Sequence, residues 1–350
     1  MARARDDAGY NQEDVAAALG VSRAMVSYWD SGKRTPNDSQ LAALSRLYRL
    51  SVAQLQGDEP IPTRADEAKM LFRGAQGSLS GEAKRGVAEF ADFLDRYATL
   101  AETTKVDLRG LKTSPFLTAP GYETAEDARR KAEEVRAHLR LGLGPISDID
   151  SVAELLGITV YRASLGRDLS KALSGAFFSH PFVGFSVLVN IDMTPGRRRF
   201  TVVHEIAHAL FHSRDKYILS LPGGGPKERF ADAFAGEFLM PVEGIRRIME
   251  DLGVGPLVTD PAVVVHLQRY FNVSYPTALF RLWRAKLISK SHYDEFQNIR
   301  PVLFAQALGY ELADEEFSQD PQQWRVRRFP SKFLGIVRNA VHKGVISPLS

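Results

Sequence analysis

Two histidines and a glutamate stand close together in the segment His204-Glu205-Ile206-Ala207-His208. Residues four apart on an α-helix lie on one face, about 40° from each other, so both imidazoles can reach a single metal ion. Glu205 is turned about 100° from His204, where its carboxylate can contact an attacking water without binding the ion. The segment therefore predicts a hydrolytic zinc centre in which His204 and His208 are ligands and Glu205 is the general base.

A hydrolytic zinc site needs a third protein ligand, because the fourth position is left open. The metzincin pattern would place glycine at 211 and histidine at 214, where the sequence has Phe211 and Arg214. His212 lies about 12 Å of helix from His204, which is too far for both to share an ion with His208. We expect His212 beside a ligand or at the surface.

Glu228 is the preferred third ligand, on the helix expected after the glycine-rich break at 223–226. Asp232 follows one turn later on the same face, where it can orient a ligating histidine through the ring nitrogen away from the metal. Glu237 is the alternative. Nine residues from Glu228 correspond to about 900° of helical rotation, so Glu237 is expected to point to the opposite side.

Two simpler interpretations stand beside this one. The histidines and Glu205 can be chance polar residues on a partly buried helix, or zinc can be bound without catalysis. The second interpretation arises because the sequence identifies no oxyanion-stabilising group. Tyr217 and His266 are candidates for that role by residue type only.

Composition limits the chemistry further. The chain has 350 residues, 44% of them hydrophobic, which suffices for one large core or two to three smaller ones. It has no cysteine, so disulfides, thiolate zinc sites and catalytic thiols are excluded and any metal must be held by His, Asp or Glu. No apolar run is long enough for a signal or a membrane span, so we expect a cytoplasmic protein with no membrane partner. The net charge of +3 permits a nucleic-acid partner without demanding one.

Residues 11–36 resemble the helix-turn-helix of the phage Cro/repressor (XRE) family along their whole length. Gly20 permits the sharp turn, Ser22 caps the second helix, and apolar side chains lock the two helices together. The residues expected to face a DNA major groove are Ser22, Arg23, Ala24, Ser27 and Tyr28, and those expected at phosphates are Gln12, Lys33 and Arg34. Arg23 is expected to read a guanine edge of a double-stranded operator.

Charge within this N-terminal segment is nearly balanced, with seven basic and six acidic side chains in residues 1–57. DNA binding should therefore be modest unless the chain forms a homodimer. The alternative is a repressor-like fold used only for protein contacts.

Apolar periodicity predicts an α+β protein that is mainly α-helical with a small β-sheet. Runs at 157–161 and 184–190 suit strands just ahead of the His204–His208 helix. The predicted parts are a five-helix-type helix-turn-helix domain at 1–57, a linker and helical connector at 58–144, a gluzincin-like zinc domain at 145–250, and a helical C-terminal module with a basic tail at 251–350.

Residues 145–290 resemble the ImmA/IrrE family of zinc-dependent peptidases, through the segments Arg199–His212 and Glu228–Pro241. The resemblance implies zinc ligands at His204, His208 and Glu228 and a base at Glu205. Asp232 stands where asparagine is commoner in the family, which keeps a polar acceptor. Residues 271–283 resemble the helical module that follows the peptidase core, and they are read equally well as a second helix-turn-helix or as ordinary helix packing.

The resemblance also implies cleavage of a repressor-type protein in a phage, mobile-element or stress circuit. Together with the N-terminal segment it predicts a DNA-binding transcriptional regulator whose zinc peptidase domain cleaves a partner repressor. The alternative is a transcription factor whose peptidase-like domain is not proteolytic and serves as a ligand sensor or protein-binding module. A further possibility is that the helix-turn-helix targets the repressor to be cut.

Overall fold

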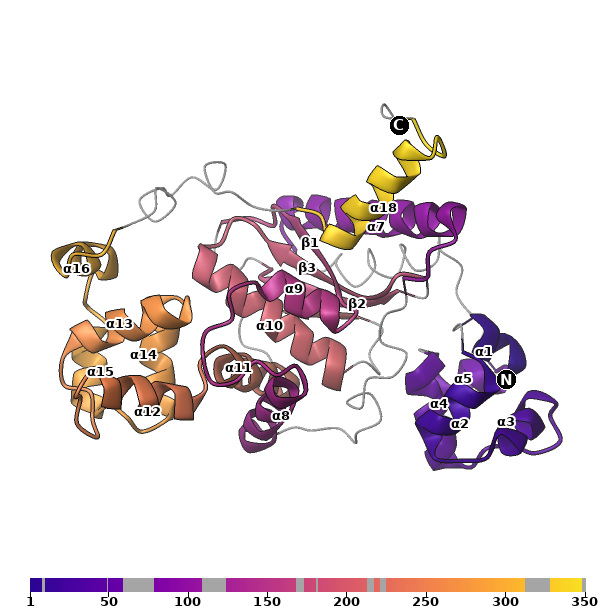
Figure 1. Ribbon diagram of the computed structural model, residues 1–350, viewed down its shortest axis with the longest axis horizontal. Coiled ribbons are helices and arrows are strands. Elements are labelled where there is room, and N and C mark those ends of the chain that lie inside the picture. Colours follow the sequence, from indigo (N-terminus) through magenta and orange to yellow (C-terminus); the bar gives the residue numbers. More distant parts are fainter. Residues whose placement is uncertain are drawn as a thin grey trace.

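A four-stranded β-sheet with the strand order β1-β3-β2-β4 lies at the centre of the part of the chain that carries His204 and His208 (Figure 1). In this computed structural model the described residues are 1–7, 10–48, 50–58, 79–108, 124–167, 173–180, 182–212, 217–220, 225–311 and 328–347. Strand β1 (Thr159–Ala163) is parallel to β3 (Gly184–Asn190). Strand β2 (Gly175–His180) is antiparallel to β3 and to β4 (Tyr217–Ser220).

The two strands predicted from β-branched and aromatic runs are present as β1 and β3, and both are buried along their whole length. Strands β2 and β4 were not predicted. Strand β2 begins with a glycine, which weakens the strand signal, and β4 has only four residues. Both form because β3 offers an edge to β2, and β2 then offers one to β4.

Helices cover both faces of this sheet. Helix α10 (Pro195–Phe211) packs on one face, where Phe177, Val187 and Val189 join its apolar side chains in a common core. Helix α7 (Gly81–Thr104) and the C-terminal helix α18 (Ser331–His342) cover the other face. The two cores follow the alternation of side chains along each strand.

The helix α10 face is closed by three further helices: α8 (Ala125–His138), α9 (Ile149–Leu155) and α11 (Pro226–Leu239). Helix α11 packs between α8 and α10. The same core continues into α12 (Val242–Asp251), α13 (Pro261–Phe271), α14 (Tyr275–Arg284), α15 (Lys290–Phe296) and α16 (Pro301–Ala307).

The N-terminal domain has its own core and comprises α1 (Ala2–Asp7), α2 (Gln12–Leu19), α3 (Arg23–Asp30), α4 (Asp38–Tyr48) and α5 (Val52–Gln56). Gly20 ends α2 at φ 65°, a left-handed conformation that disfavours side chains with a Cβ. The predicted five-helix domain and the mainly helical α+β class are both confirmed.

Packing differs from the predicted partition at 58–144 and 251–350, whose exact boundaries stay predictions. Helices α7 and α8, expected as a connector, each contribute buried residues to a core of the sheet region. Helix α18 comes from the predicted basic tail, yet Ile336 and Ala340 are buried in the core with α7. Residues 312–327 lie outside the described part of the chain.

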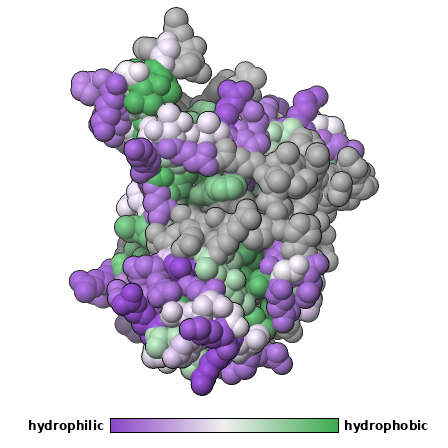
Figure 2. Space-filling view, turned by 90° about the vertical axis from the view of Figure 1, so that its right-hand side faces the viewer, coloured by the Kyte–Doolittle hydropathy of each residue, from purple (hydrophilic) through white to green (hydrophobic). Residues whose placement is uncertain are grey.

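In the described residues no helix is both long and apolar enough to span a bilayer. Hydrophilic and hydrophobic side chains mix over the face shown in Figure 2, and hydrophobic residues gather near its top, where the C-terminal helix α18 projects.

Candidate metal centre

Helix α10 carries the two histidines on its buried side. The helix begins at Pro195, a residue suited to a first helical position because it lacks an N–H, and residues 201–210 are buried. His204 and His208 face the same direction, and their Nε2 atoms lie 3.1 Å apart. The four-residue spacing on a single helix thus brings both Nε2 atoms close together.

Helix α11 brings Glu228 to that point. It also begins with a proline, Pro226, and Glu228 stands in its first turn. One carboxylate oxygen of Glu228 lies 3.0 Å from His204 Nε2, and the other lies 3.2 Å from His208 Nε2. One ligand atom from each of the three side chains falls within 4.8 Å of the others.

These distances suit a zinc ion. Tetrahedral zinc with bonds of about 2.0–2.1 Å holds its ligand atoms roughly 3.3 Å apart, so shifts of a few tenths of an ångström would admit the ion. Imidazole nitrogen and carboxylate oxygen are ordinary zinc donors, and three protein ligands leave a position for water. The residues present fit the metal.

The outer nitrogens of both histidines are also held. His204 Nδ1 lies 2.9 Å from Asp232 Oδ1, and His208 Nδ1 lies 2.9 Å from His212 Nδ1. His212 is only 5% exposed, so of its two expected positions it takes the buried one, beside His208. An acceptor at Nδ1 keeps the proton there and leaves Nε2 free for a metal.

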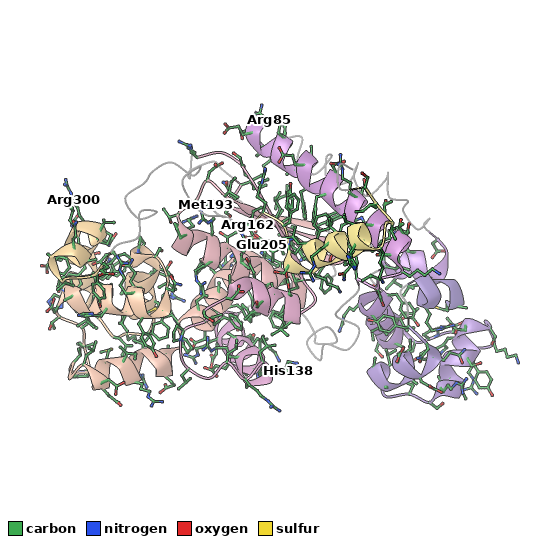
Figure 3. The ribbon with its side chains drawn as sticks, turned by 45° about the horizontal axis from the view of Figure 1, so that its top comes forward. Arg85, His138, Arg162, Met193, Glu205 and Arg300 are labelled. Carbon is green, nitrogen blue, oxygen red and sulfur yellow. The ribbon has the colours of Figure 1, made fainter. Side chains whose placement is uncertain are left out.

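Glu205 is fully buried between α10 and the sheet, and Figure 3 shows it deep among the side chains. Among the described residues neither of its carboxylate oxygens has a hydrogen-bonding partner of good geometry. Burial raises the pKa of Glu205 to about 8, although the positive charge of His204 and the hydroxyl of Ser220 act in the opposite direction. A carboxylate poised near neutral pH suits a group that accepts a proton and later gives it up.

The side chains of His204, His208 and Glu228 shift one another's pKa values. Burial alone would lower the pKa of His204, but hydrogen bonds to Asp232 and Glu228 raise it to about 10. Burial also lowers the pKa of His208. Burial would raise the pKa of Glu228, but hydrogen bonds from the two histidines bring it to about 2. These hydrogen bonds therefore favour an ionised Glu228 beside a protonated His204.

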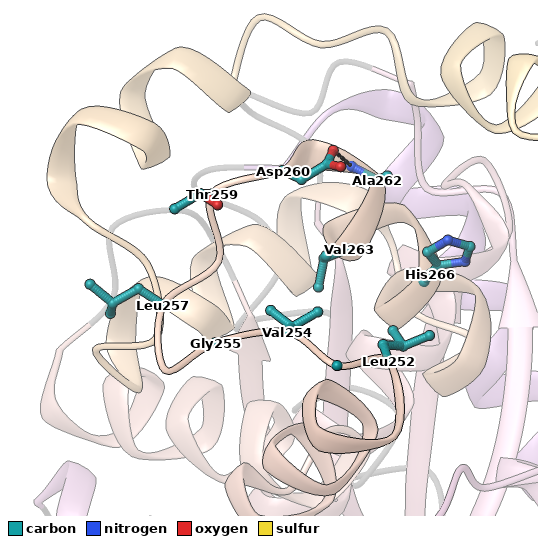
Figure 4. A pocket seen from close by; sticks show the side chains of 10 residues that line it. Leu252, Val254, Gly255, Leu257, Thr259, Asp260, Ala262, Val263 and His266 are labelled. Carbon is teal, nitrogen blue, oxygen red and sulfur yellow. Dashed lines mark hydrogen bonds between the residues drawn. The ribbon is translucent and has the colours of Figure 1, made fainter.

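The other candidates lie away from this cluster. Glu237 is paired with Arg281, so it is committed elsewhere. His266 bonds Tyr310 and lines a hollow of about 400 Å³ formed by residues 252–266, shown in Figure 4, which includes none of the three ligand residues. The side chain of Tyr217 lies outside the described residues.

The N-terminal domain presents its predicted DNA-contacting residues around α3. Ser22 caps α3 by accepting from the Met25 amide at 3.3 Å, and Ser27 is half-buried. The exposed residues also include Arg23, Ala24, Tyr28, Lys33 and Arg34, and the exposed fraction of Tyr28 is 42%. Gln12 differs from expectation, because its amide donates to Asp30 at 3.1 Å within the domain rather than standing free for a phosphate.

Helices α13 and α14 repeat the geometry of this motif. Asn272 has φ 54° at the turn and Ser274 caps α14, as Gly20 and Ser22 do between α2 and α3. The packing is different, however. Leu279, which corresponds to Ser27, is only 2% exposed.

The turn between α13 and α14 is itself covered. A Cβ added at Gly196, near the start of α10, would lie 2.6 Å from the backbone nitrogen of Ser274. The turn therefore packs on the helix that carries the histidines. Of the two interpretations of residues 271–283, this arrangement favours ordinary helix packing over groove reading.

A sheet backed by a helix with two histidines, and a glutamate supplied by the next helix, defines a metallopeptidase-like domain, here joined to a helix-turn-helix domain. Residues 153–283 match the family model described as the IrrE N-terminal-like domain, Peptidase M78, and residues 1–55 match a helix-turn-helix model. No curated protein matches the chain. The chain is thus an XRE-type helix-turn-helix fused to a domain of the ImmA/IrrE metallopeptidase family, which marks a transcription regulator with a peptidase-like domain.

Proposed function

We propose that this chain binds operator DNA through its N-terminal domain and uses zinc, held by His204, His208 and Glu228, to hydrolyse a peptide bond in a partner repressor. The observation that carries the proposal is the combination of three ligand atoms at zinc spacing with a buried carboxylate beside them. A purely structural zinc site is normally closed by a fourth protein ligand. The described residues bring together three.

Zinc bound there would polarise the scissile carbonyl and make water a stronger nucleophile. Asp232 and His212 would hold the two imidazoles in the ligating orientation. Glu205 would accept the proton of the attacking water at its carboxylate and pass it to the leaving amide nitrogen. Its burial between α10 and the sheet keeps bulk water away from that transfer.

The exposed residues of α3 support operator binding as the second half of the proposal. Arg23 and Tyr28 stand on the helix that enters the major groove in this motif. We infer a homodimer on DNA, because the domain itself carries almost no net charge.

The experiment uses the full zinc-loaded chain and the repressor-type proteins encoded beside its gene. Cleavage is followed by gel electrophoresis, and the new termini are identified by mass spectrometry. We expect one cut in one repressor, and Glu205→Gln should abolish the cut while keeping zinc at one equivalent. If wild type never cuts and Glu205→Gln leaves regulation in cells unchanged, the domain is a sensor or binding module instead.

A further inference from the structure

Gly175, the first residue of β2, lies directly beneath the carboxylate of Glu205. A Cβ built on Gly175 would lie 2.6 Å from Glu205 Oε1 and 2.7 Å from Thr201 Cγ2. Thr201 and Glu205 are one turn apart on α10, so the helix rests on the sheet at this glycine. No methyl group fits between them without displacing one of these side chains.

The sheet cannot retreat from α10 at this position. Gly175 is paired with Val189 on β3 and with Ser220 on β4, so neighbours hold it on both sides. The added Cβ would also lie 2.9 Å from the carbonyl oxygen of Leu188, which belongs to the backbone of β3. Just before the strand, Ser174 donates to Ser220 through its amide at 3.2 Å and its hydroxyl at 2.9 Å.

The carboxylate of Glu205 is the part that can move. Among the described residues its two oxygens have no hydrogen-bonding partner of good geometry, so their position is defined by contact with α10 and with the sheet, which includes the hydroxyl of Ser220. The metal-ligand atoms lie on other side chains, and Gly175 touches none of them in its closest contacts. Filling the space at Gly175 should therefore shift the base and leave the metal ligands in place.

We infer that Gly175 is a positioning residue that seats the carboxylate of Glu205, and this inference rests on the proposed role of Glu205 as base. Gly175 does not have a positive φ, so its backbone conformation does not require a glycine. The close approach of α10 is what requires one. Its absent side chain leaves the space that the carboxylate fills.

Gly86 provides a matched control. It lies on α7, on the opposite face of the sheet, and a Cβ there would lie 2.3 Å from Leu165 Cδ2 and 2.6 Å from the carbonyl oxygen of Ser164. Gly86→Ala thus introduces a comparable steric conflict between a helix and the sheet region, far from any contact with Glu205. It separates a general packing loss from displacement of the base.

The first test does not depend on peptidase activity. The melting temperatures of the zinc-loaded full chain are compared for Gly175→Ala and Gly86→Ala, each with Glu205 present and with Glu205→Ala. We expect Gly175→Ala to lower Tm clearly less when Glu205 is truncated, and Gly86→Ala to lower it equally in both backgrounds. Equal losses for Gly175→Ala in both backgrounds would overturn the inference.

The second test uses cleavage of the partner repressor. Gly175→Ala should keep one equivalent of zinc and its KM while kcat falls on the order of a hundredfold, as for a catalytic group misplaced by about 1 Å. Gly86→Ala should change kcat by less than about twofold once its folded fraction is matched. An unchanged kcat in Gly175→Ala would reject the positioning role, whereas absence of cleavage in wild type would reject the proposed function and leave the Tm test standing.

Discussion

The carboxylate of Glu237 and the guanidinium of Arg281 form an ion pair that ties α11 to α14. Glu237 is 1% exposed and also accepts from the amide of Val242 at 3.0 Å, while Arg281 donates to the carbonyl of Met240 at 3.0 Å. The glutamate nine residues after Glu228 thus holds the end of the helix whose first turn supplies Glu228. One helix performs both tasks because its two glutamates point to different sides.

Loss of this ion pair should lower the free energy of unfolding and leave zinc binding unchanged. Glu237→Gln leaves the buried Arg281 without its counter-charge, which typically costs about 3–5 kcal/mol. We expect a lower urea midpoint and an unchanged zinc content. Glu228→Gln should lower the zinc content, and exposed Glu250→Gln should change neither the zinc content nor the midpoint. Zinc loss in Glu237→Gln at an unchanged midpoint would identify Glu237 as the ligand instead.

Asp232 should set zinc affinity through His204. Removing the acceptor by Asp232→Ala frees the imidazole to rotate, and the expected loss of zinc affinity is about 10–100-fold. Asp232→Asn keeps an oxygen that can accept the Nδ1 proton, so its loss should be only a few-fold. Affinity is measured by competition with a chelator, with exposed Asp251→Asn as the control. Equal losses for alanine and asparagine would contradict a hydrogen-bonding role.

Zinc binding should release a proton from His204. Since the pKa of His204 is raised to about 10 in the free site, it is protonated at pH 7 and the metal must displace that proton. The lowered pKa values of Glu228 and His208 mean that neither adds a proton there. With Glu205 replaced by glutamine, zinc affinity should therefore rise about tenfold for each pH unit between pH 7 and 9.

The measurement is calorimetry in two buffers of different ionisation enthalpy. Glu205→Gln is the variant to use, because the pKa of Glu205 is raised to about 8 and its carboxyl would otherwise contribute protons of its own. One proton per zinc is expected. A binding enthalpy independent of the buffer would refute the protonated His204.

DNA binding should separate base reading from phosphate contact. Arg23→Ala should cost about 1–3 kcal/mol on an operator selected from random duplex DNA, with relaxed preference at one base pair. Lys33→Ala should weaken binding to all sequences and reduce the salt slope by about one. Fluorescence anisotropy at several salt concentrations distinguishes them, with exposed Arg246→Ala as control. A uniform loss from Arg23→Ala would remove it as the base reader.

The sequence alone determined those features that depend only on residues close together in the chain. Helical spacing placed His204 and His208 on one face and separated Glu228 from Glu237, because rotation along a helix is a local property. The turn at Gly20 followed by Ser22 identified the N-terminal motif for the same reason, since both residues act on the backbone next to them.

Tertiary structure decided what depends on packing between distant segments. Strands β2 and β4 formed because partners were available, although their own residues carry weak strand signals. The turn at Ser274 has the local geometry of a DNA-binding motif. Its packing against α10, which is a tertiary contact, favours a structural role over DNA binding. Gly175 and Glu205 are 30 residues apart in the chain, and they come into contact only when α10 packs on the sheet. No local sequence pattern encodes such a contact.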